Sequence, residues 1–378
     1  MRYTRAMKKT QSCKNAQDRG ALVSIEKIQI IKLGIDVHAD DVRVVRQLDN
    51  ATPQPAQKFT HAQFLVWVAK QVKLAAKVYS CYEAGPFGFG LHRQLTKLGV
   101  TNIVIRPQNW DELGKGVKTD KLDALALCLR LDRYVQGNKK ALAVVRVPTP
   151  EEEAARWPSR QREQMLKERK RLESQGRSLL LTQGVRVKGH WWQEKDWKLL
   201  VTKLAQHSPV LVATLEITRK IVTQVHEQVV ALTNQLEAVA NQDRAKGVGA
   251  LTTEVLRREI CDWDRFTNRR QVASYTGLCP SVYASGRRMV QGSITKHGNP
   301  RLRAALIELA WRLVMWQPHY PPVAKWREML LNKKTPSGQK KKAIVAIGRH
   351  LAIDLWRLAT GQTTPEKLNL IVPAGIFA

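Results

Sequence analysis

The order of short β-branched runs and helical segments between residues 29 and 135 constrains the fold of this chain most. Strands are expected at 29–37, 42–46, 58–60, 77–82 and 101–105, and helices at 61–76, 89–98 and 119–135. Three strands come first, as a meander, and alternating helices and strands follow them. This order predicts an α/β layer built on a mixed sheet over residues 26–145.

Carboxylates occupy matching places in that order. Asp36 lies in the first strand, Glu83 ends the fourth, and Asp120 and Asp123 share a face of the last helix. The same order is found in ribonuclease-H-like folds, in which the first and fourth strands are neighbours and the last helix can reach them. Four converging carboxylates repel one another unless a cation joins them, and oxygen ligands favour Mg²⁺ or Mn²⁺. The four residues are therefore predicted to form a metal site for phosphoryl transfer, although each alone would be a cap or turn residue.

The charge of the chain indicates what it binds. Lys and Arg number 63 and Asp and Glu 32, which leaves a net charge of +31. Because 43% of the residues are hydrophobic, we expect a folded protein. Its positive charge predicts that it binds a polyanion, and nucleic acid is the commonest one. A surface for anionic lipid is the alternative, but the sequence shows neither a clear amphipathic basic helix nor a lipidation signal. No membrane span is expected, since no run of about 18 apolar residues occurs.

Residues 146–243 are predicted to form a helical linker with a coiled-coil seam. Nine positions step by four and three residues in strict alternation, and eight of them are apolar: Leu211, Leu215, Thr218, Val222, Val225, Val229, Leu232, Leu236 and Val239. Such a seam pairs with another helix. The partner is either a second copy, which would make the linker a multimer-forming stalk, or residues 160–183, where Met165, Leu172 and Leu179 are spaced by seven. The stalk is the favoured interpretation.

Two further basic stretches allow more than one interpretation. Residues 1–25 are basic and show no apolar period, which predicts a flexible arm that either contacts phosphate or has no role. Trp191, Trp192 and Trp197 lie among cations in the linker. They could stack on bases, but packing on a neighbouring helix is the favoured interpretation.

The second half of the chain is expected to hold a small, mainly helical unit at 244–330 and a basic helical segment at 331–378. Lys246-Gly247-Val248-Gly249 precedes a helical pattern, and a Gly-X-Gly at a helix start either offers N–H groups to phosphate or makes an ordinary turn. Farther on, 275–286 reads Tyr-Thr-Gly-Leu-Cys-Pro-Ser-Val-Tyr-Ala-Ser-Gly, and 292–303 reads Gly-Ser-Ile-Thr-Lys-His-Gly-Asn-Pro-Arg-Leu-Arg. Five cations in this region could hold a phosphate and neutralise transition-state charge: Arg287, Arg288, Lys296, Arg301 and Arg303.

These stretches resemble the motifs of the DEDD transposases of bacterial insertion sequences, to which the pilin-gene invertases are related. So do Gly34-Ile35-Asp36-Val37, Tyr82-Glu83-Ala84-Gly85 and Lys118-Thr119-Asp120-Lys121-Leu122-Asp123-Ala124. The resemblance covers roughly residues 30–135 and 244–315, and it departs from the family at 246–249, where Pro-Gly-Ile-Gly is usual.

The resemblance implies an α/β ribonuclease-H-like (RuvC-like) N-terminal domain, a coiled-coil linker and a mainly α C-terminal transposase domain. It implies that Ser285, in the Ser-Gly pair, is the nucleophile, with Ser281 and Ser293 as the nearest rivals. It also implies a composite site, in which metal and serine come from different domains or subunits. A structured noncoding guide RNA that pairs with donor and target DNA is implied as well.

The sequence therefore predicts an insertion-sequence transposase that cuts and rejoins DNA with Mg²⁺ or Mn²⁺ and a serine. We expect a dimer or tetramer that forms through the coiled coil. We expect it in the bacterial cytoplasm, associated with the nucleoid, because the five cysteines include no CxxC pair and suit a reducing compartment. Two alternatives stay open. One is a metal-dependent Holliday-junction-type nuclease that uses water, and the other is a noncatalytic nucleic-acid-binding scaffold.

Overall fold

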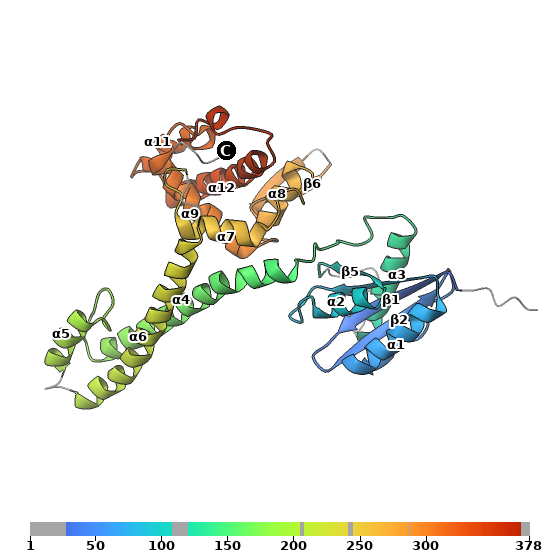
Figure 1. Ribbon diagram of the computed structural model, residues 1–378. Coiled ribbons are helices and arrows are strands. Elements are labelled where there is room, and N and C mark those ends of the chain that lie inside the picture. The colour runs from blue at the N-terminus through green and yellow to red at the C-terminus, as the bar shows by residue number, and fades with distance from the viewer. Residues whose placement is uncertain (1–27, 108–119, 205–207, 241–244, 287, 372–378) are drawn as a thin grey trace, which may run out of the picture. The chain divides into compact units, whose positions relative to one another are not determined.

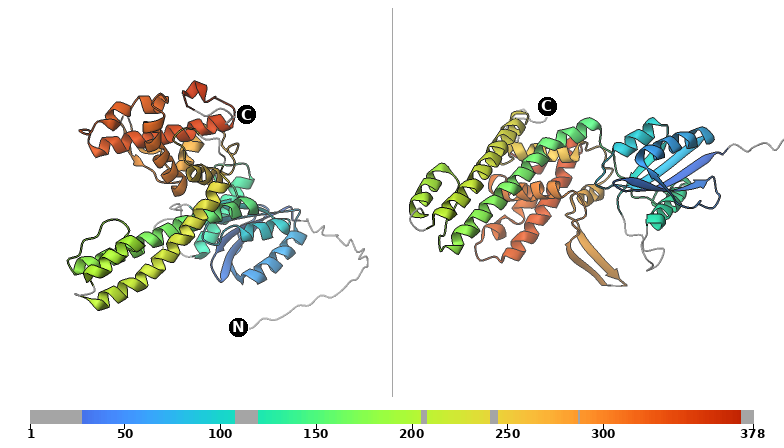
Figure 2. Two further views of the ribbon diagram at one scale, coloured as in Figure 1. Left: turned by 60° about the vertical axis from the view of Figure 1, so that its left-hand side comes forward. Right: turned by 90° about the horizontal axis from the view of Figure 1, so that it is seen from below.

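A computed structural model describes residues 28–107, 120–204, 208–240, 245–286 and 288–371. The chain divides into two compact units, Met1–Val147 and Pro148–Ala378, and each is described by itself (Figures 1 and 2). The basic arm expected at 1–25 lies outside the described residues. Among the helices that the structure does describe, none is both long enough and apolar enough to cross a membrane.

The first unit is built on a five-stranded sheet. Its strands are β1 (Ile30–Val37), β2 (Asp41–Leu48), β3 (Gln57–Thr60), β4 (Lys77–Glu83) and β5 (Thr101–Ile105). They lie in the order β3-β2-β1-β4-β5, with β1 antiparallel to β2 and parallel to β4. The predicted element order and the mixed sheet are confirmed, and the first and fourth strands are neighbours.

Helices cover both faces of this sheet. They are α1 (His61–Leu74), α2 (Gly90–Lys97) and α3 (Asp120–Val135). The Thr60 hydroxyl and the Gln63 side chain form a capping box that begins α1. One face of the sheet packs on α1 and α2, and α3 covers the other face.

The second unit is mostly helical. Its linker helices are α4 (Pro150–Thr182), α5 (Glu194–Leu204) and α6 (Pro209–Ala238). They are followed by α7 (Ala250–Ile260), α8 (Arg269–Thr276), α9 (Pro300–Trp316), α10 (Pro321–Ala324), α11 (Arg327–Leu331), α12 (Ser337–Ala359) and the 3₁₀ turn η2 (Glu366–Leu368). Helices α9 and α12 share one hydrophobic core, so the basic C-terminal segment packs with the region before it.

The heptad seam on α6 packs against α4 of the same chain (Figure 1). Arg162 bonds Thr233 and Arg169 bonds His226, so the two helices run antiparallel. The seam residues buried on α6 are Leu215, Thr218, Val222, Val229 and Leu236. Of the two seam partners that the sequence allows, the structure has the intrachain one, so the favoured interpretation of the seam as a stalk that pairs with a second copy is corrected.

The three tryptophans of the linker are buried. Trp191, Trp192 and Trp197 are 1%, 3% and 7% exposed. The Trp192 indole N–H donates to the Glu173 carboxylate at 2.6 Å, and the Trp191 ring fills the space at Gly176, where a Cβ would lie 2.0 Å from it. The packing interpretation is correct, and these side chains do not offer a stacking surface for bases.

A two-stranded hairpin was not expected from the sequence. Strands β6 (Pro280–Ser285) and β7 (Arg288–Ile294) pair antiparallel and project from the helices of their unit (Figure 2). Because its side chains are exposed on both faces, the hairpin has no apolar alternation to reveal it.

Candidate functional site

The position of α3 is set by a matched spacing between this helix and β1. Asp120, Ala124, Cys128 and Asp132 follow one another at intervals of four along one face of α3. They face Lys32, Gly34 and Asp36, which are alternate residues of β1. Four helical residues rise about 6 Å, and two strand residues about 6.6 Å, so the two series stay in step. The contacts follow from this register: Lys32 Nζ pairs with Asp132, the Gly34 backbone meets Ala124 and Cys128, and Asp36 faces the start of α3.

Gly34 allows this close approach. A Cβ at this position would lie 2.3 Å from both the Ala124 carbonyl oxygen and the Cys128 nitrogen. Only glycine leaves room for the α3 backbone at that distance. At the far end of the contact, Lys32 is 2% exposed and also donates to the Asp49 carbonyl at 2.7 Å. The glycine and the buried ion pair together hold α3 against the strand that carries Asp36.

Asp36, His38 and Asp120 form a cluster of metal-type ligands at the end of β1. Their ligand atoms all lie within 4.8 Å of one another. His38 Nε2 lies 3.0 Å from Asp36 Oδ2 and 3.6 Å from Asp120 Oδ2. Arg43, which pairs with Asp36 across β1 and β2, places its Nε 2.9 Å from Asp120 Oδ2. His38 was not among the residues singled out from the sequence.

Of the other two predicted carboxylates, one lies on α3 and the other ends β4, the strand beside β1. Asp123 is one turn further along α3. Ile35 pairs with Tyr82 in the parallel β1–β4 register, so Asp36 and Glu83 follow at the same edge of the sheet. Burial raises the pKa of Asp36; His38 opposes the shift, and the negative charges of Asp123 and Asp120 add to it. The structure thus brings Asp36 and Asp120 together, places Asp123 one turn further along α3, and places Glu83 at the end of the neighbouring strand.

The donor set suits a divalent cation. Two carboxylates and an imidazole are ligands for Mg²⁺, Mn²⁺ and other divalent ions. His38 Nε2 and Arg43 Nε are buried and face carboxylate oxygens without hydrogen-bonding geometry, so among the described residues neither nitrogen has a hydrogen-bond partner. The residues present therefore fit a metal site.

Ser285 ends β6 at the tip of the hairpin. It is exposed, and it pairs with Arg288 at the start of β7. Gly286, which follows it, has φ of +55°, in the left-handed region that favours glycine in a two-residue hairpin turn. Gly286 therefore begins the turn that follows Ser285, and the Ser285 hydroxyl lies exposed beside it. Ser281 is engaged differently, since its Oγ donates to the Ser293 carbonyl at 3.0 Å.

The Lys-His-Gly-Asn segment builds the base of this hairpin. Asn299 caps α9 by accepting from the N–H groups of Arg301 and Leu302 at 3.0 and 3.2 Å. Gly298 has φ of +149°, and a Cβ there would lie 2.5 Å from the Tyr275 carbonyl oxygen. This motif holds α8, β7 and α9 together rather than opening a binding loop.

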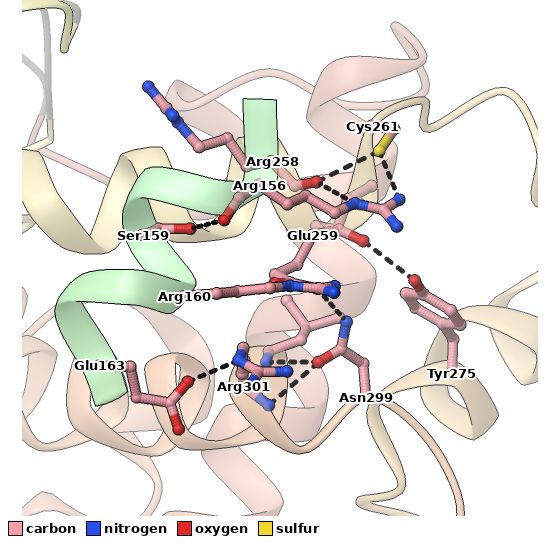
Figure 3. Close-up of polar contacts among 12 residues, drawn as sticks. Arg156, Ser159, Arg160, Glu163, Arg258, Glu259, Cys261, Tyr275, Asn299 and Arg301 are labelled. Carbon is pink, nitrogen blue, oxygen red and sulfur yellow. Dashed lines mark hydrogen bonds and ion pairs between the residues drawn. The ribbon is translucent and has the colours of Figure 1, made fainter. Parts of the chain in front are cut away.

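Glu259 ties the same base to the linker helix (Figure 3). Its carboxylate is 1% exposed and accepts two hydrogen bonds from Arg160 of α4, at 3.0 and 2.9 Å, and one from Asn299 at 2.7 Å. The Tyr275 hydroxyl donates to the Glu259 carbonyl at 2.9 Å. Burial opposes ionisation of Glu259, but the bonds from Arg160 and Asn299 outweigh it and lower the pKa.

The five predicted phosphate-binding cations differ in their surroundings. Arg288 and Lys296 are exposed. Arg301 pairs with Glu163 of α4, as Figure 3 shows, and Arg303 Nη1 donates to the carbonyls of Thr276 and Lys296 at 3.2 Å. Arg287 lies outside the described residues. Two of the five therefore have intramolecular partners, and their role at phosphate stays a prediction.

The sequence is similar to those of several transposases. Residues 243–322 match the profile described as the transposase IS116/IS110/IS902 family. The protein y4rJ of Sinorhizobium fredii, which is named as a transposase, is 31% identical over 326 residues, covering 77% of this chain and 79% of its own. The transposase for insertion sequence element IS1328 of Yersinia enterocolitica is 23% identical, covering 89% of this chain and 98% of its own. The transposase for insertion sequence element IS1111A of Coxiella burnetii is 24% identical, covering 90% and 92%.

A clustered set of metal-type ligands on a mixed sheet, in a chain of net charge +31, is typical of proteins that act on nucleic acid. The similarities name the group within that class. The chain belongs to the IS116/IS110/IS902 family of transposases.

Proposed function

We propose that this chain is the transposase of an insertion sequence and that it cuts and rejoins DNA through Ser285 and a divalent-cation site. The observation that carries the proposal is the placement of Ser285 at the tip of an exposed hairpin, beside Arg288, in a chain that belongs to a transposase family. The strand order of the first unit, with its acids at one edge, supports a ribonuclease-H-like fold for the metal-binding unit.

The proposed chemistry exchanges one phosphodiester for another. Ser285 Oγ forms a bond to phosphorus while the bond from phosphorus to one deoxyribose oxygen breaks. The serine loses its proton and the leaving sugar oxygen takes one up. Because the phosphate stays a diester, now linked to serine, its bond energy is kept for rejoining. A serine hydroxyl needs a base or a metal for this attack. Arg288 is the described cation closest in register to Ser285 and would stabilise charge on the phosphate.

Asp36, Glu83, Asp120 and Asp123 would hold Mg²⁺ or Mn²⁺, and His38 would join them as a nitrogen ligand. A divalent cation there would polarise the phosphate and lower the pKa of an attacking hydroxyl. Because the carboxylates and Ser285 lie in different units of the chain, this proposal includes a composite site formed from both, within one subunit or between two.

The partners we propose are donor and target DNA, a structured guide RNA and further copies of the chain. The net charge of +31 supports polyanion binding without separating RNA from DNA. Sequencing the RNA that purifies with the protein tests the guide. One discrete species encoded beside the protein's own gene supports it. Heterogeneous RNA, or none, supports recognition of DNA by the protein alone.

Substitution of the serine tests the chemistry. The substrate is a plasmid that carries the ends of the insertion sequence, with Mg²⁺ and the RNA that purifies with the protein. We expect Ser285→Ala to bind DNA but to form no covalent protein–DNA adduct, whereas Ser281→Ala, the matched control on the same strand, forms it. Asp36→Asn should abolish cleavage. Cleavage of DNA by Ser285→Ala would instead identify a nuclease that uses water. DNA that the wild-type protein leaves uncut in Mg²⁺ would identify a noncatalytic scaffold.

A further inference from the structure

The β6–β7 hairpin has two faces, and Ser285 belongs to one of them. Side chains alternate along a strand, and residues directly opposite in an antiparallel pair share a face. The register pairs Ser285 with Arg288, Ala284 with Met289, and Tyr283 with Val290. One face, here called the serine face, therefore carries Ser285, Arg288, Tyr283 and Val290. The opposite face carries Ala284 and Met289.

The serine face presents an uncovered aromatic side chain. Tyr283 is 70% exposed, and Val290 opposite it is 43% exposed. On the neighbouring strand, a Cβ at Gly292 would lie 3.4 Å from Tyr283 Cε2, so the ring lies beside a glycine, with no side chain there to cover it. A two-stranded hairpin has no core of its own in which such a ring could be buried. The ring is therefore available to a partner outside the unit.

We propose that Tyr283 stacks on a nucleobase of the DNA one or two nucleotides from the phosphate that Ser285 attacks. This proposal rests on the proposed function, because a reacting Ser285 brings DNA to the serine face. Ser285 and Tyr283 are two residues apart, which is about 6.8 Å along a strand. Nucleotides of one DNA strand advance about 3.4 Å each along the axis, so two nucleotides cover the same distance.

The chemistry of the serine face favours a nucleobase over a protein surface. Every base has a π face, so an aromatic side chain can stack on it whatever the sequence. Arg288, on the same face, offers a cation to the adjacent phosphate. Met289 provides an internal comparison, because it is 67% exposed on the opposite face and lies one register position nearer the tip than Tyr283.

The first measurement is the rate of adduct formation on the plasmid described above. We expect Tyr283→Ala to slow it by about tenfold to a hundredfold, the loss of one stacked base. Tyr283→Phe should keep the rate, and Met289→Ala should leave it within about twofold, since that side chain faces away. Unchanged unfolding midpoints would show that each variant is folded. An equal loss in Met289→Ala, or no loss in Tyr283→Ala, would overturn the proposal.

The second measurement reads stacking without catalysis. DNA carrying 2-aminopurine at each position within two nucleotides of the cleaved phosphate is bound to Ser285→Ala and to Ser285→Ala with Tyr283→Ala. We expect the second protein to give brighter fluorescence at one position, because the quenching stack is lost. If wild type forms no adduct while this difference persists, the proposed function fails and the stacking contact stands. If the adduct forms and fluorescence is equal in both proteins, only the stacking contact fails.

Discussion

Gly34→Ala should separate the carboxylates of the first unit without removing any of them. The added Cβ would lie 2.3 Å from the Ala124 carbonyl oxygen and the Cys128 nitrogen, where ordinary contact begins at 3.4 Å. The α3 backbone must therefore move away from β1 by 3.4 − 2.3 = 1.1 Å. Overpacking of this kind costs about 1–3 kcal/mol. A displacement of about 1 Å at a reacting centre costs about a hundredfold in rate.

Urea unfolding and Mg²⁺-dependent adduct formation, measured on the full chain, test this expectation. Gly90→Ala is the matched control in the same unit, because a Cβ there meets nothing within 4 Å. We expect Gly34→Ala to lose both stability and rate while it still binds DNA, and Gly90→Ala to keep both. A Gly34→Ala protein with wild-type rate and stability would refute the role of the glycine contact in placing Asp120.

Asp36, the Lys32–Asp132 ion pair and Asn299 can each be tested by substitution. Burial raises the pKa of Asp36, so its ionised form destabilises the fold above that pKa. Asp36→Asn should therefore raise the unfolding midpoint at pH 7 in EDTA, with a smaller gain toward pH 4, and should abolish stabilisation by Mg²⁺. A lower midpoint of Asp36→Asn in EDTA would contradict the direction of this pKa shift. Lys32→Met should cost about 3–5 kcal/mol in urea unfolding, because Asp132 keeps its bond from the Gln136 amide but loses its cation. Asp132→Leu in the same protein should recover most of that loss, and no recovery would show that the ion pair is not its cause. Asn299→Ser should keep the α9 cap and lose the bond to Glu259, whereas Asn299→Ala should lose both. Asn299→Ala should therefore be less stable than Asn299→Ser by about 1 kcal/mol. Equal unfolding midpoints of the two variants would show that the cap contributes nothing.

The sheet of the first unit and the place of its acids could be predicted because strands and helices leave different periods in the sequence. His38 could not, since a single histidine after a strand has no distinguishing pattern. Its one signal was its position two residues after Asp36, which alternation places on the same side of the chain. The seam on α6 predicted a partner helix but not which one, because a heptad fixes a face and not its neighbour.

The second unit was harder to predict because its decisive contacts join distant parts of the chain. Arg301 could be expected at phosphate from its motif, but it pairs with Glu163, which lies 138 residues earlier. Glu259 carried no motif at all, yet its carboxylate holds α4 and the start of α9 in place. The hairpin that presents Ser285 was missed because its strands bury neither face, and only the glycine of its turn gave a local signal.

The most direct test of the central proposal is to identify the atom that becomes linked to DNA. The adduct formed in Mg²⁺ would be digested with nuclease and trypsin, and the peptides analysed by fragmentation mass spectrometry. Cleavage after Arg270 and Arg287 gives the peptide 271–287, which contains Ser274, Ser281 and Ser285. We expect a nucleotide on this peptide, attached at Ser285. A nucleotide on any other residue, or cleaved DNA with no linked peptide, would contradict the proposal that Ser285 is the nucleophile.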